Sequence, residues 1–186
     1  QKRSQQTQTR ILEAARQLFE VKGCENVTAE MIAAEARVAK GTIFAHFQDR
    51  SNLVAAVGMQ RKQEALKLVA VQAALERTGP LAERVLKLYH PLLSLFSGNP
   101  EFARLFIDQS AVDDGPWSRE FRRSCLHFEG MLKEYLEEEA GLSGKPEAVS
   151  LMADGVQAFF LQIITYRIAG WIKDDQAAED KFRAYL

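Results

Sequence analysis

Residues 28–47 read TAEMIAAEARVAKGTIFAHF, and this stretch is the most informative part of the chain. Its pattern predicts two short helices joined by a tight turn, the geometry that places a helix in the major groove of DNA. Ala33 is small enough to let the two helices approach closely. Ile32, Val38 and Ile43 supply apolar contacts between them, and Phe47 closes the end. The stretch therefore predicts a helix-turn-helix.

The second helix of this pair, about residues 39–46, presents a mixed set of side chains outward. The set consists of Lys40, Thr42, Phe44, Ala45 and His46. Hydrogen-bond donors and apolar groups together are what contact with base edges and phosphates requires. Phe44 and His46 also suit ordinary packing in a three-helix domain, and that alternative stays open.

A wider match extends this motif in both directions. Together with residues 9–23 (TRILEAARQLFEVKG) and 49–57, the stretch resembles the N-terminal domain of tetracycline-repressor-like (TetR family) transcription regulators. Three helices, their spacings and the run KGTIFAHF at residues 40–47 all agree, without a gap. The resemblance implies that the third helix enters the major groove, while the first helix and the start of the fourth contact phosphates. The DNA-binding residues that it implies are Thr28, Arg37, Lys40, Gly41, Thr42, Phe44, Ala45, His46 and Arg50.

These implied residues have different chemistry. Lys40 can donate to guanine O6 or N7, whereas Phe44 and Ala45 can touch a thymine methyl group. Thr28 and Arg50 flank the helix and are placed for phosphates, and Gly41 lets the helix backbone lie close to DNA.

Two positions depart from the family pattern, namely Arg37 where Gly is usual and Phe44 where Tyr is usual. If Arg37 keeps a positive φ, it costs about 1 kcal/mol relative to Gly. The alternative is an altered turn. Phe44 lacks the hydroxyl that could reach a phosphate, so DNA affinity or operator preference is expected to differ.

Charge and cysteine content limit the remaining classes. The net charge is −1, but residues 1–50 hold eight Lys/Arg against six Asp/Glu, and residues 51–186 hold sixteen against nineteen. A basic end joined to an acidic remainder fits local contact with DNA. Cys24 and Cys125 have no metal-ligand spacing and are expected as small buried residues in a reducing compartment. No metal site and no cofactor are expected.

Nothing in the sequence favours an enzyme, a secreted chain or a membrane protein. No Ser/His/Asp set, zinc spacing, phosphate loop or dinucleotide glycine pattern is present, so we expect no catalytic residues. No secretory signal is visible. The most apolar run, residues 156–172, contains Gln157, Gln162 and Arg167, which argues against a membrane span. A cytoplasmic protein is expected.

Helical periodicity runs through almost the whole chain and predicts an all-α protein. Beyond the helix-turn-helix, helices are expected over about 49–76, 80–97, from Pro100 to a loop at 110–116, over 118–140 and 147–172, and in a short tail. Thr28, Asp49 and Ser118 are the expected helix caps. We expect two domains, a three-helix helix-turn-helix DNA-binding domain at 1–50 and a helical ligand-sensing and dimerisation domain at 51–186.

The helix at 147–172 is apolar on nearly all sides, so it must be buried on nearly all sides. The face expected to pack inward carries Met152, Val156, Phe160, Ile163 and Ile164. The face expected to meet a second subunit carries Gly155, Ala158, Thr165, Ala169 and Trp171. The helix at 118–140 would complete a four-helix seam between two subunits.

A ligand-responsive regulator also needs a pocket in the second domain, and such pockets are mostly apolar with few polar groups. The candidate lining residues are His90, Phe96, Phe102, Phe106, Gln109, Trp117, Phe121, Phe128, Phe159, Gln162 and Tyr166. Aromatic residues at helical spacing equally suit a core, and His90 suits a structural role.

Two further side chains leave alternatives open. Arg167 lies in an apolar helix and needs a partner, which can be a carboxylate of the fold, a second subunit or an anionic ligand. Cys125 has Arg122, Arg123 and His127 nearby in sequence, so a thiol switch is a minor alternative.

The resemblance as a whole implies a ligand-responsive DNA-binding regulator without enzymatic activity. Such a protein most often acts as a repressor, binds an inverted-repeat operator as a homodimer and is released by a small, largely apolar effector. Its partners would be double-stranded DNA, that effector and a second copy of the chain, but no membrane. The rival classes are an enzyme that binds an apolar substrate and a helical adaptor whose basic end binds protein.

Overall fold

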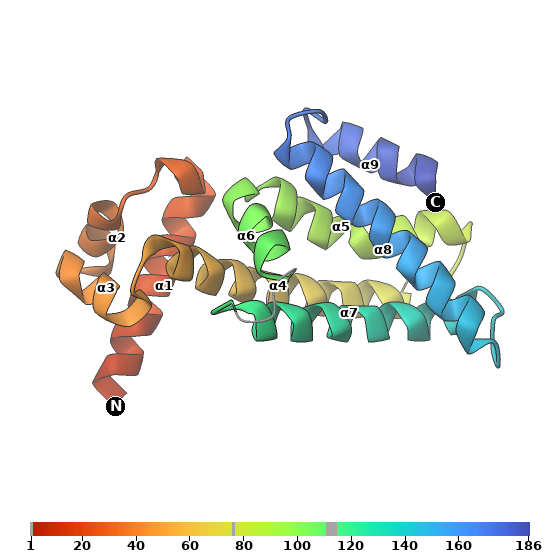
Figure 1. Cartoon of the computed structure of the whole chain (residues 1–186), viewed down its shortest axis with the longest axis horizontal. Helices are drawn as coiled ribbons and strands as arrows, with labels where there is room; N and C mark the ends of the chain where they lie inside the picture. Colours follow the sequence, from red (N-terminus) through yellow and green to blue (C-terminus); the bar gives the residue numbers. More distant parts are fainter. Residues whose placement is uncertain (1, 76, 111–114) are drawn as a thin grey trace.

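The computed structural model describes residues 2–75, 77–110 and 115–186 of the chain, and this part is helical throughout, with no strand (Figure 1). Its elements are α1 (Lys2–Lys22), the short 3-10 helix η1 (Cys24–Asn26), α2 (Ala29–Ala36), α3 (Lys40–Phe47), α4 (Arg50–Leu75), α5 (Leu81–Ser97), α6 (Pro100–Ser110), α7 (Ser118–Glu139), α8 (Pro146–Ile168) and α9 (Asp175–Tyr185). The predicted all-α class is confirmed. Most of the loop expected at 110–116 lies outside the described residues.

Helices α1, α2 and α3 pack into a small unit at one end of the molecule, which we call the head (Figure 1). Its core contains Ile11 and Phe19 of α1, Ile32 of α2, and Ile43 and Phe47 of α3, all of them buried. Ala33 is buried as well, and Val38 is half-buried against the core. The helix-turn-helix expected from residues 28–47 is therefore confirmed.

The two ends of α2 show why the chain turns where it does. The Thr28 hydroxyl accepts a hydrogen bond from the Met31 N–H at 3.3 Å, so Thr28 is the N-cap, as expected. At the other end Arg37 adopts φ 53° and ψ 51°. Of the two alternatives for Arg37, the structure therefore has the left-handed residue and not an altered turn. The same turn is closed by the Val38 N–H, which donates to the Ala33 carbonyl at 2.9 Å.

The junction of α3 and α4 is a second tight turn. Gln48 adopts φ 64° and ψ −55°, and the Asp49 N–H donates to the Phe47 carbonyl at 2.7 Å. A three-residue turn of this kind is rare and strained. The Asp49 carboxylate accepts from the Asn52 N–H at 2.8 Å, which confirms Asp49 as the cap of α4.

Helices α4 to α9 form the rest of the molecule, which we call the body. Helix α4 links the two parts, since it packs against α1 and α3 in the head and against α5, α6 and α7 in the body (Figure 1). It approaches α6 closely at Gly58, where an added Cβ would lie 2.1 Å from Cδ2 of Phe102. Only glycine at position 58 lets the buried Phe102 ring rest on the α4 backbone.

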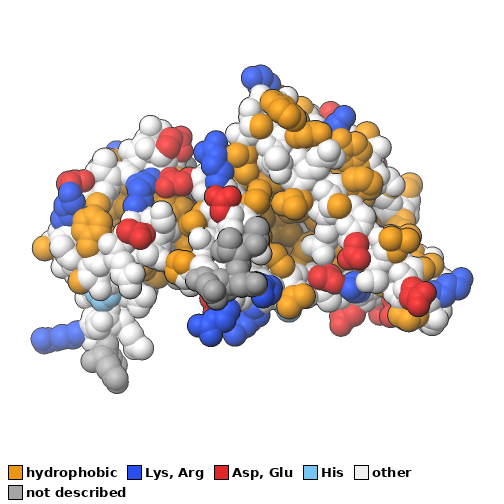
Figure 2. Space-filling model, viewed as in Figure 1, with side chains coloured by type: hydrophobic (Ala, Val, Ile, Leu, Met, Phe, Trp, Pro, Cys, Tyr) orange, Lys and Arg blue, Asp and Glu red, His pale blue; other side chains and the backbone are white. Residues whose placement is uncertain are grey.

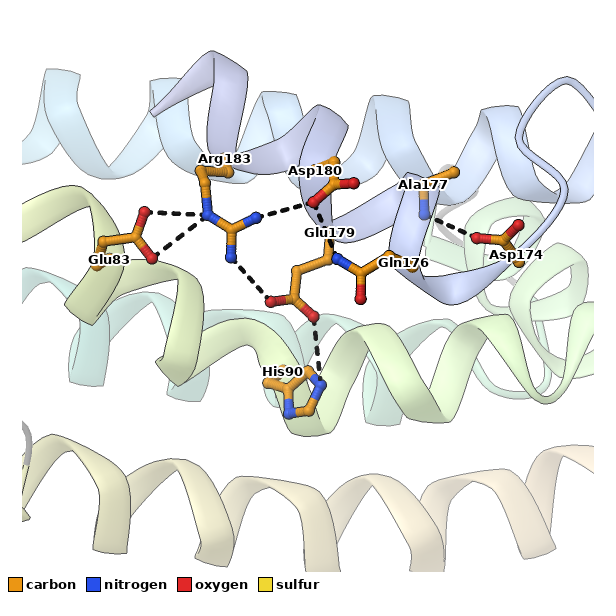
Figure 3. Close-up of polar contacts among 8 residues, drawn as sticks. All are labelled: Glu83, His90, Asp174, Gln176, Ala177, Glu179, Asp180 and Arg183. Carbon is orange, nitrogen blue, oxygen red and sulfur yellow. Dashed lines mark hydrogen bonds and ion pairs between the residues drawn. The ribbon is translucent and has the colours of Figure 1, made fainter.

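Helix α9 is fastened along α5 by apolar and polar contacts. The rings of Phe182 and Tyr89, both buried, meet edge to face with centroids 5.1 Å apart. Figure 3 shows the polar contacts, in which Arg183 reaches Glu83 at 3.0 Å and Glu179 lies 3.6 Å from His90. The expected tail helix is thus confirmed, and it covers α5.

Two expected helix ends are wrong. Helix α8 ends at Ile168 rather than near 172, because Gly170 adopts φ 75° and the Trp171 N–H turns back to the Tyr166 carbonyl at 2.9 Å. Ser118 is not the cap of α7, because Trp117 occupies the N-cap position and Ser118 is the first helical residue. The Arg167 side chain, at the end of α8, donates to Asp175 at 3.0 Å and to the Ile172 carbonyl at 3.0 Å, so the intramolecular alternative holds.

Helix α8 leaves much of its apolar surface uncovered. Val156, Ile163 and Ile164 are buried as expected, but Met152 is 38% exposed because it lies at the edge of the packed face. The residues left outside are Leu151, Ala158, Phe159, Leu161, Thr165, Ala169 and Trp171. By length and composition alone, α8 could cross a membrane, and 28% of its most apolar window is buried within the chain.

Candidate DNA-reading face and ligand cavity

Helix α3 turns one face to solvent and the other to the core of the head. Ile43 and Phe47 occupy the core side. The exposed or half-exposed residues are Lys40, Gly41, Thr42, Phe44, Ala45 and His46. The structure thus brings together on one surface the residues of α3 that the sequence placed there.

The ammonium of Lys40 is engaged in the free protein. It forms an ion pair with the Glu30 carboxylate of α2 and lies 5.9 Å from the centroid of the Phe44 ring. The hydrogen bond from Lys40 lowers the pKa of Glu30 to about 2. Both side chains are well exposed, and exposed pairs of this kind contribute little to stability. A DNA phosphate or a guanine edge can therefore replace Glu30 at small cost.

The surface around the start of α3 is open. A Cβ added to Gly41 would meet no heavy atom within 4 Å. Ala39, the N-cap of α3, offers no side-chain hydrogen bond to the first turn, and such free amides attract phosphate. Thr28 and Arg37, at the two ends of α2, are exposed.

The resemblance placed Arg50 at a phosphate, but in the structure its side chain is engaged in hydrogen bonds within the chain. Its guanidinium donates to the Cys24 and Val27 carbonyls of the head, both at 2.6 Å. It also donates to the two carboxylate oxygens of Glu101 in α6, at 3.1 and 3.0 Å. These contacts take up most of the donors that a phosphate would need, so Arg50 connects the head with α6.

The electrostatics of this junction follow from its partial burial. Burial by itself would raise the pKa of Glu101, but hydrogen bonds from Arg50 and Cys24 outweigh it and hold the pKa below its usual value. Burial raises the pKa of the Cys24 thiol far above its usual range, so Cys24 is a neutral thiol. The junction is an ionised Arg50–Glu101 pair braced by carbonyls of the head.

The body contains a cavity of about 480 Å³ between helices α4 and α8, within the size range of small-molecule sites. Figure 2 shows a hollow surrounded by hydrophobic side chains in this part of the molecule. Its lining residues are Lys62, Leu92, Phe96, Phe106, Ile107, Ser110, Cys125, Phe128, Asp154, Gln157, Ala158, Phe160 and Leu161.

Three of the eleven candidate ligand residues, Phe96, Phe106 and Phe128, line this cavity. Phe102 and Phe121 are instead buried in the core, with ring centroids 6.0 Å apart.

The other six candidates lie elsewhere. The Gln109 side chain accepts from the Trp117 N–H at 3.5 Å, and Trp117 Nε1 donates to Asn52 at 2.8 Å. His90 is on the surface beside α9. Phe159 packs on Tyr185, with ring centroids 5.0 Å apart. The side-chain amide of Gln162 donates a hydrogen bond to the Tyr166 hydroxyl at 2.8 Å along α8.

The other ten lining residues were not expected from the sequence, and among them Lys62, Ser110 and Cys125 carry polar groups. A signal for Lys62 was present, because it lies four and seven residues before Leu66 and Val69 of the apolar α4 stripe. A lysine on the buried face of a helix is unusual and marks a special environment.

Comparison with known proteins agrees with this geometry. Residues 11–57 match the profile of the family described as bacterial regulatory proteins, tetR family. The HTH-type transcriptional regulator UidR of Escherichia coli (strain K12) is 33% identical over 66 residues, which cover 36% of this chain and 34% of UidR. An HTH-type transcriptional regulator of Staphylococcus aureus (strain USA300) is 38% identical over 52 residues, 28% of each chain. The match thus spans about a third of the length of these relatives or less.

Solved structures resemble the chain over nearly its whole length. The Thermus thermophilus FadR, a TetR family transcriptional repressor in complex with lauroyl-CoA, has a TM-score of 0.63 at 20% identity, covering 96% of this chain and 92% of that one. The Bacillus subtilis regulator FadR in complex with stearoyl-CoA has a TM-score of 0.60 at 15% identity, covering 95% of each chain. At such identities the likeness shows the fold. Residues 11–57 thus resemble the tetR family of bacterial regulatory proteins, and the overall fold is that of these solved TetR-family regulators.

Proposed function

We propose that this chain is a ligand-responsive, DNA-binding transcription regulator. The observation that carries the proposal is the solvent face of α3, which combines donors and apolar groups within the segment that matches the tetR family. Lys40, Thr42 and His46 would contact bases or phosphates, and Phe44 and Ala45 would lie against the groove. Thr28 and Arg37 would contact the flanking backbone. Arg50 would position the head instead.

We place the boundary of the DNA-binding domain at residue 50, the first residue of α4, with the sensing and dimerisation domain at 51–186. The exposed apolar side of α8 supports a homodimer, because a second copy would cover the residues that this chain leaves outside. Two heads would then meet half-sites about 34–36 Å apart in an inverted repeat. A protein of this kind works in the cytoplasm, where the DNA is, and the second copy rather than a membrane covers α8.

Helix α6 is the element that supports a response to ligand. It contributes Phe106, Ile107 and Ser110 to the cavity and Glu101 to the contact with Arg50. A ligand that moves α6 would therefore disturb the ion pair between Glu101 and Arg50, which connects α6 with the head. The FadR regulators with this fold bind lauroyl-CoA and stearoyl-CoA, which supports an effector with an apolar part. We propose that the effector releases the DNA, so that the protein acts as a repressor.

Selection of bound sequences from a random double-stranded DNA pool tests this function with the purified chain. We expect an inverted repeat, bound by two chains, with an affinity that falls steeply as salt rises. A helical adaptor or an apolar-substrate enzyme would enrich no sequence and bind weakly even at low salt, and that result would overturn the proposal.

Light scattering at micromolar concentration tests the dimer separately. We expect about twice the mass of one chain, and a Leu161→Glu variant should give the mass of one chain because it puts a charge into the seam. Val71 in α4 is also an exposed aliphatic residue, so Val71→Glu is the matched control and should stay dimeric. A single-chain mass for the wild type would contradict the dimer.

A further inference from the structure

We propose that the body cavity binds a free carboxylate, with Lys62 pairing with the carboxylate group and the aromatic walls covering an apolar tail. This inference rests on the proposed function and names the chemistry of its effector. The ligand would be an amphipathic monoanion, such as a medium-chain aliphatic acid or an aryl carboxylic acid.

Lys62 is buried without a carboxylate partner among the described residues. Its side chain, on α4, is only 3% exposed and lines the cavity. Its ammonium donates to the Ser124 hydroxyl at 2.7 Å and lies 4.5 Å from the centroid of the Phe106 ring. Among residues 2–75, 77–110 and 115–186, no carboxylate forms an ion pair with it. One neutral hydroxyl and one ring face leave much of the charge uncompensated.

Two other cations of the body with little exposed surface do have carboxylate partners. Arg84, also buried, pairs with the Glu139 carboxylate and lies over the Tyr135 ring. Arg167 pairs with Asp175 at 3.0 Å. Because the fold supplies carboxylates to these two arginines, the lack of a carboxylate at Lys62 within the described part of the chain is specific to the cavity.

The charge on Lys62 persists at neutral pH. Burial lowers the pKa of this ammonium to about 8, against a small opposing interaction with Cys125. The protonated form therefore predominates at pH 7, and an anion in the cavity would relieve the cost of burying it.

Two groups of the cavity bear on how a ligand would lie. Ser110 lines the cavity, and its buried hydroxyl has no hydrogen-bond partner within the described structure. Asp154, in contrast, is exposed on α8 and interacts with Lys133, so it does not neutralise Lys62. Ala158 and Leu161 are exposed on the same helix. The carboxylate would thus occupy the deep side at Lys62, and the tail would run toward α8.

This polarity distinguishes a free acid from a thioester or an alcohol. A thioester carbonyl and a hydroxyl carry no net charge, so either would leave the ammonium uncompensated. The apolar walls offer Leu92, Phe96 and Phe128 to the tail but nothing to a second anionic group. One carboxylate with a compact apolar tail therefore matches the cavity best.

Isothermal titration calorimetry on the full chain, at pH 7 and without DNA, tests the proposal. The probes are two matched pairs, octanoate with 1-octanol and 2-naphthoate with 2-naphthol. We expect at least one carboxylate to bind about tenfold or more tightly than its alcohol. Lys62→Met, which keeps an apolar stem of similar length, should abolish that preference. Lys67→Met, at an exposed lysine of the same helix, should retain it.

Each result has a defined meaning. Equal binding of acid and alcohol by the wild type, no binding of either carboxylate, or an unchanged preference in Lys62→Met would overturn the proposal. The titration contains no DNA, so it is independent of the regulator function. A chain that selects an operator but prefers the alcohols would keep the proposed function and lose this inference. A chain that binds the acids but selects no DNA would do the reverse.

Discussion

The head and the body differ in where they keep the polar groups meant for a partner. In the head, Lys40 is exposed on α3 and is paired with Glu30, a neighbour that is exposed as well. In the body, Lys62 is buried in a cavity and has no carboxylate partner in the described part of the chain. A long polymer such as DNA can only be met on an open surface, whereas a small ligand can be enclosed. This contrast fits the two proposed partners, which differ in size.

The same contrast has an energetic side. An exposed ion pair such as Lys40–Glu30 contributes little to folding, so Lys40 can be replaced by other residues at little cost to stability. A buried and uncompensated ammonium lowers the stability of the empty body. Stability measurements should therefore separate the two lysines.

Lys62→Met should give the largest change, an increase of about 2–3 kcal/mol in the unfolding free energy at pH 7. The folded-state pKa of about 8 lies below the value of the unfolded chain, so the folded state carries a penalty below pH 8. That penalty fades as the pH rises toward the unfolded value, and the gain of the variant should shrink between pH 8 and 10. Denaturant unfolding at pH 7, 8, 9 and 10 measures this.

Arg84→Met is the contrasting variant. It removes one of the two arginines that pair with Glu139, leaving Arg77, and should lower stability because a partly buried ion pair is lost. A Lys62→Met protein less stable than the wild type at pH 7 would contradict the contrast between the head and the body.

Lys40→Ala should weaken binding to the selected duplex by about 1–3 kcal/mol while leaving the melting temperature unchanged. The reason is that Lys40 exchanges an exposed partner, Glu30, for DNA. Fluorescence anisotropy on the duplex and thermal unfolding measure the two quantities. Lys67→Ala, on the surface of the body, is the control and should change neither. Unaltered affinity in Lys40→Ala would remove Lys40 from the reading face.

The two glycines Gly58 and Gly41 compare the packed body with the open head. Gly58→Ala forces a Cβ to within 2.1 Å of the buried Phe102 ring and should cost about 1–3 kcal/mol of stability. Gly41→Ala meets nothing in the free protein, so its stability should hold or rise, while DNA affinity falls if the backbone lies close to the groove. Gly130→Ala, with no atom near its Cβ, controls for helix propensity in the body. Equal stability of the Gly58 and Gly130 variants would contradict the close contact of α4 and α6.

Arg37→Gly should have the smallest effect, a gain of about 1 kcal/mol, because Arg37 adopts φ 53°. That gain corresponds to about 2–4 °C in melting temperature for a chain of this size. An unchanged or lower melting temperature would mean that the left-handed backbone is compensated locally.

The head could be predicted from the sequence because its determinants are local. Thr28, Arg37 and Asp49 act within a few residues of their own positions, and the core of α3 follows from spacing alone. The order and the approximate bounds of the body helices could be predicted for the same reason.

The cavity could not be predicted, because it depends on how α4, α5, α6, α7 and α8 meet. Phe96 and Phe102 are both aromatic residues at helical spacing, yet one lines the cavity and the other packs against Gly58. The same limit applies to Arg50, whose partner Glu101 lies far along the chain. Only the packed structure distinguishes such residues.

The most direct test of a ligand-responsive regulator is the displacement of DNA by the ligand. Fluorescence anisotropy of the labelled inverted repeat would be followed while the wild-type chain is titrated with the carboxylate that calorimetry shows to bind. The account predicts that the duplex is released over the concentration range in which the cavity fills, and that Lys62→Met retains the duplex over that range. A duplex that stays bound to the wild-type chain while the cavity is saturated would contradict it.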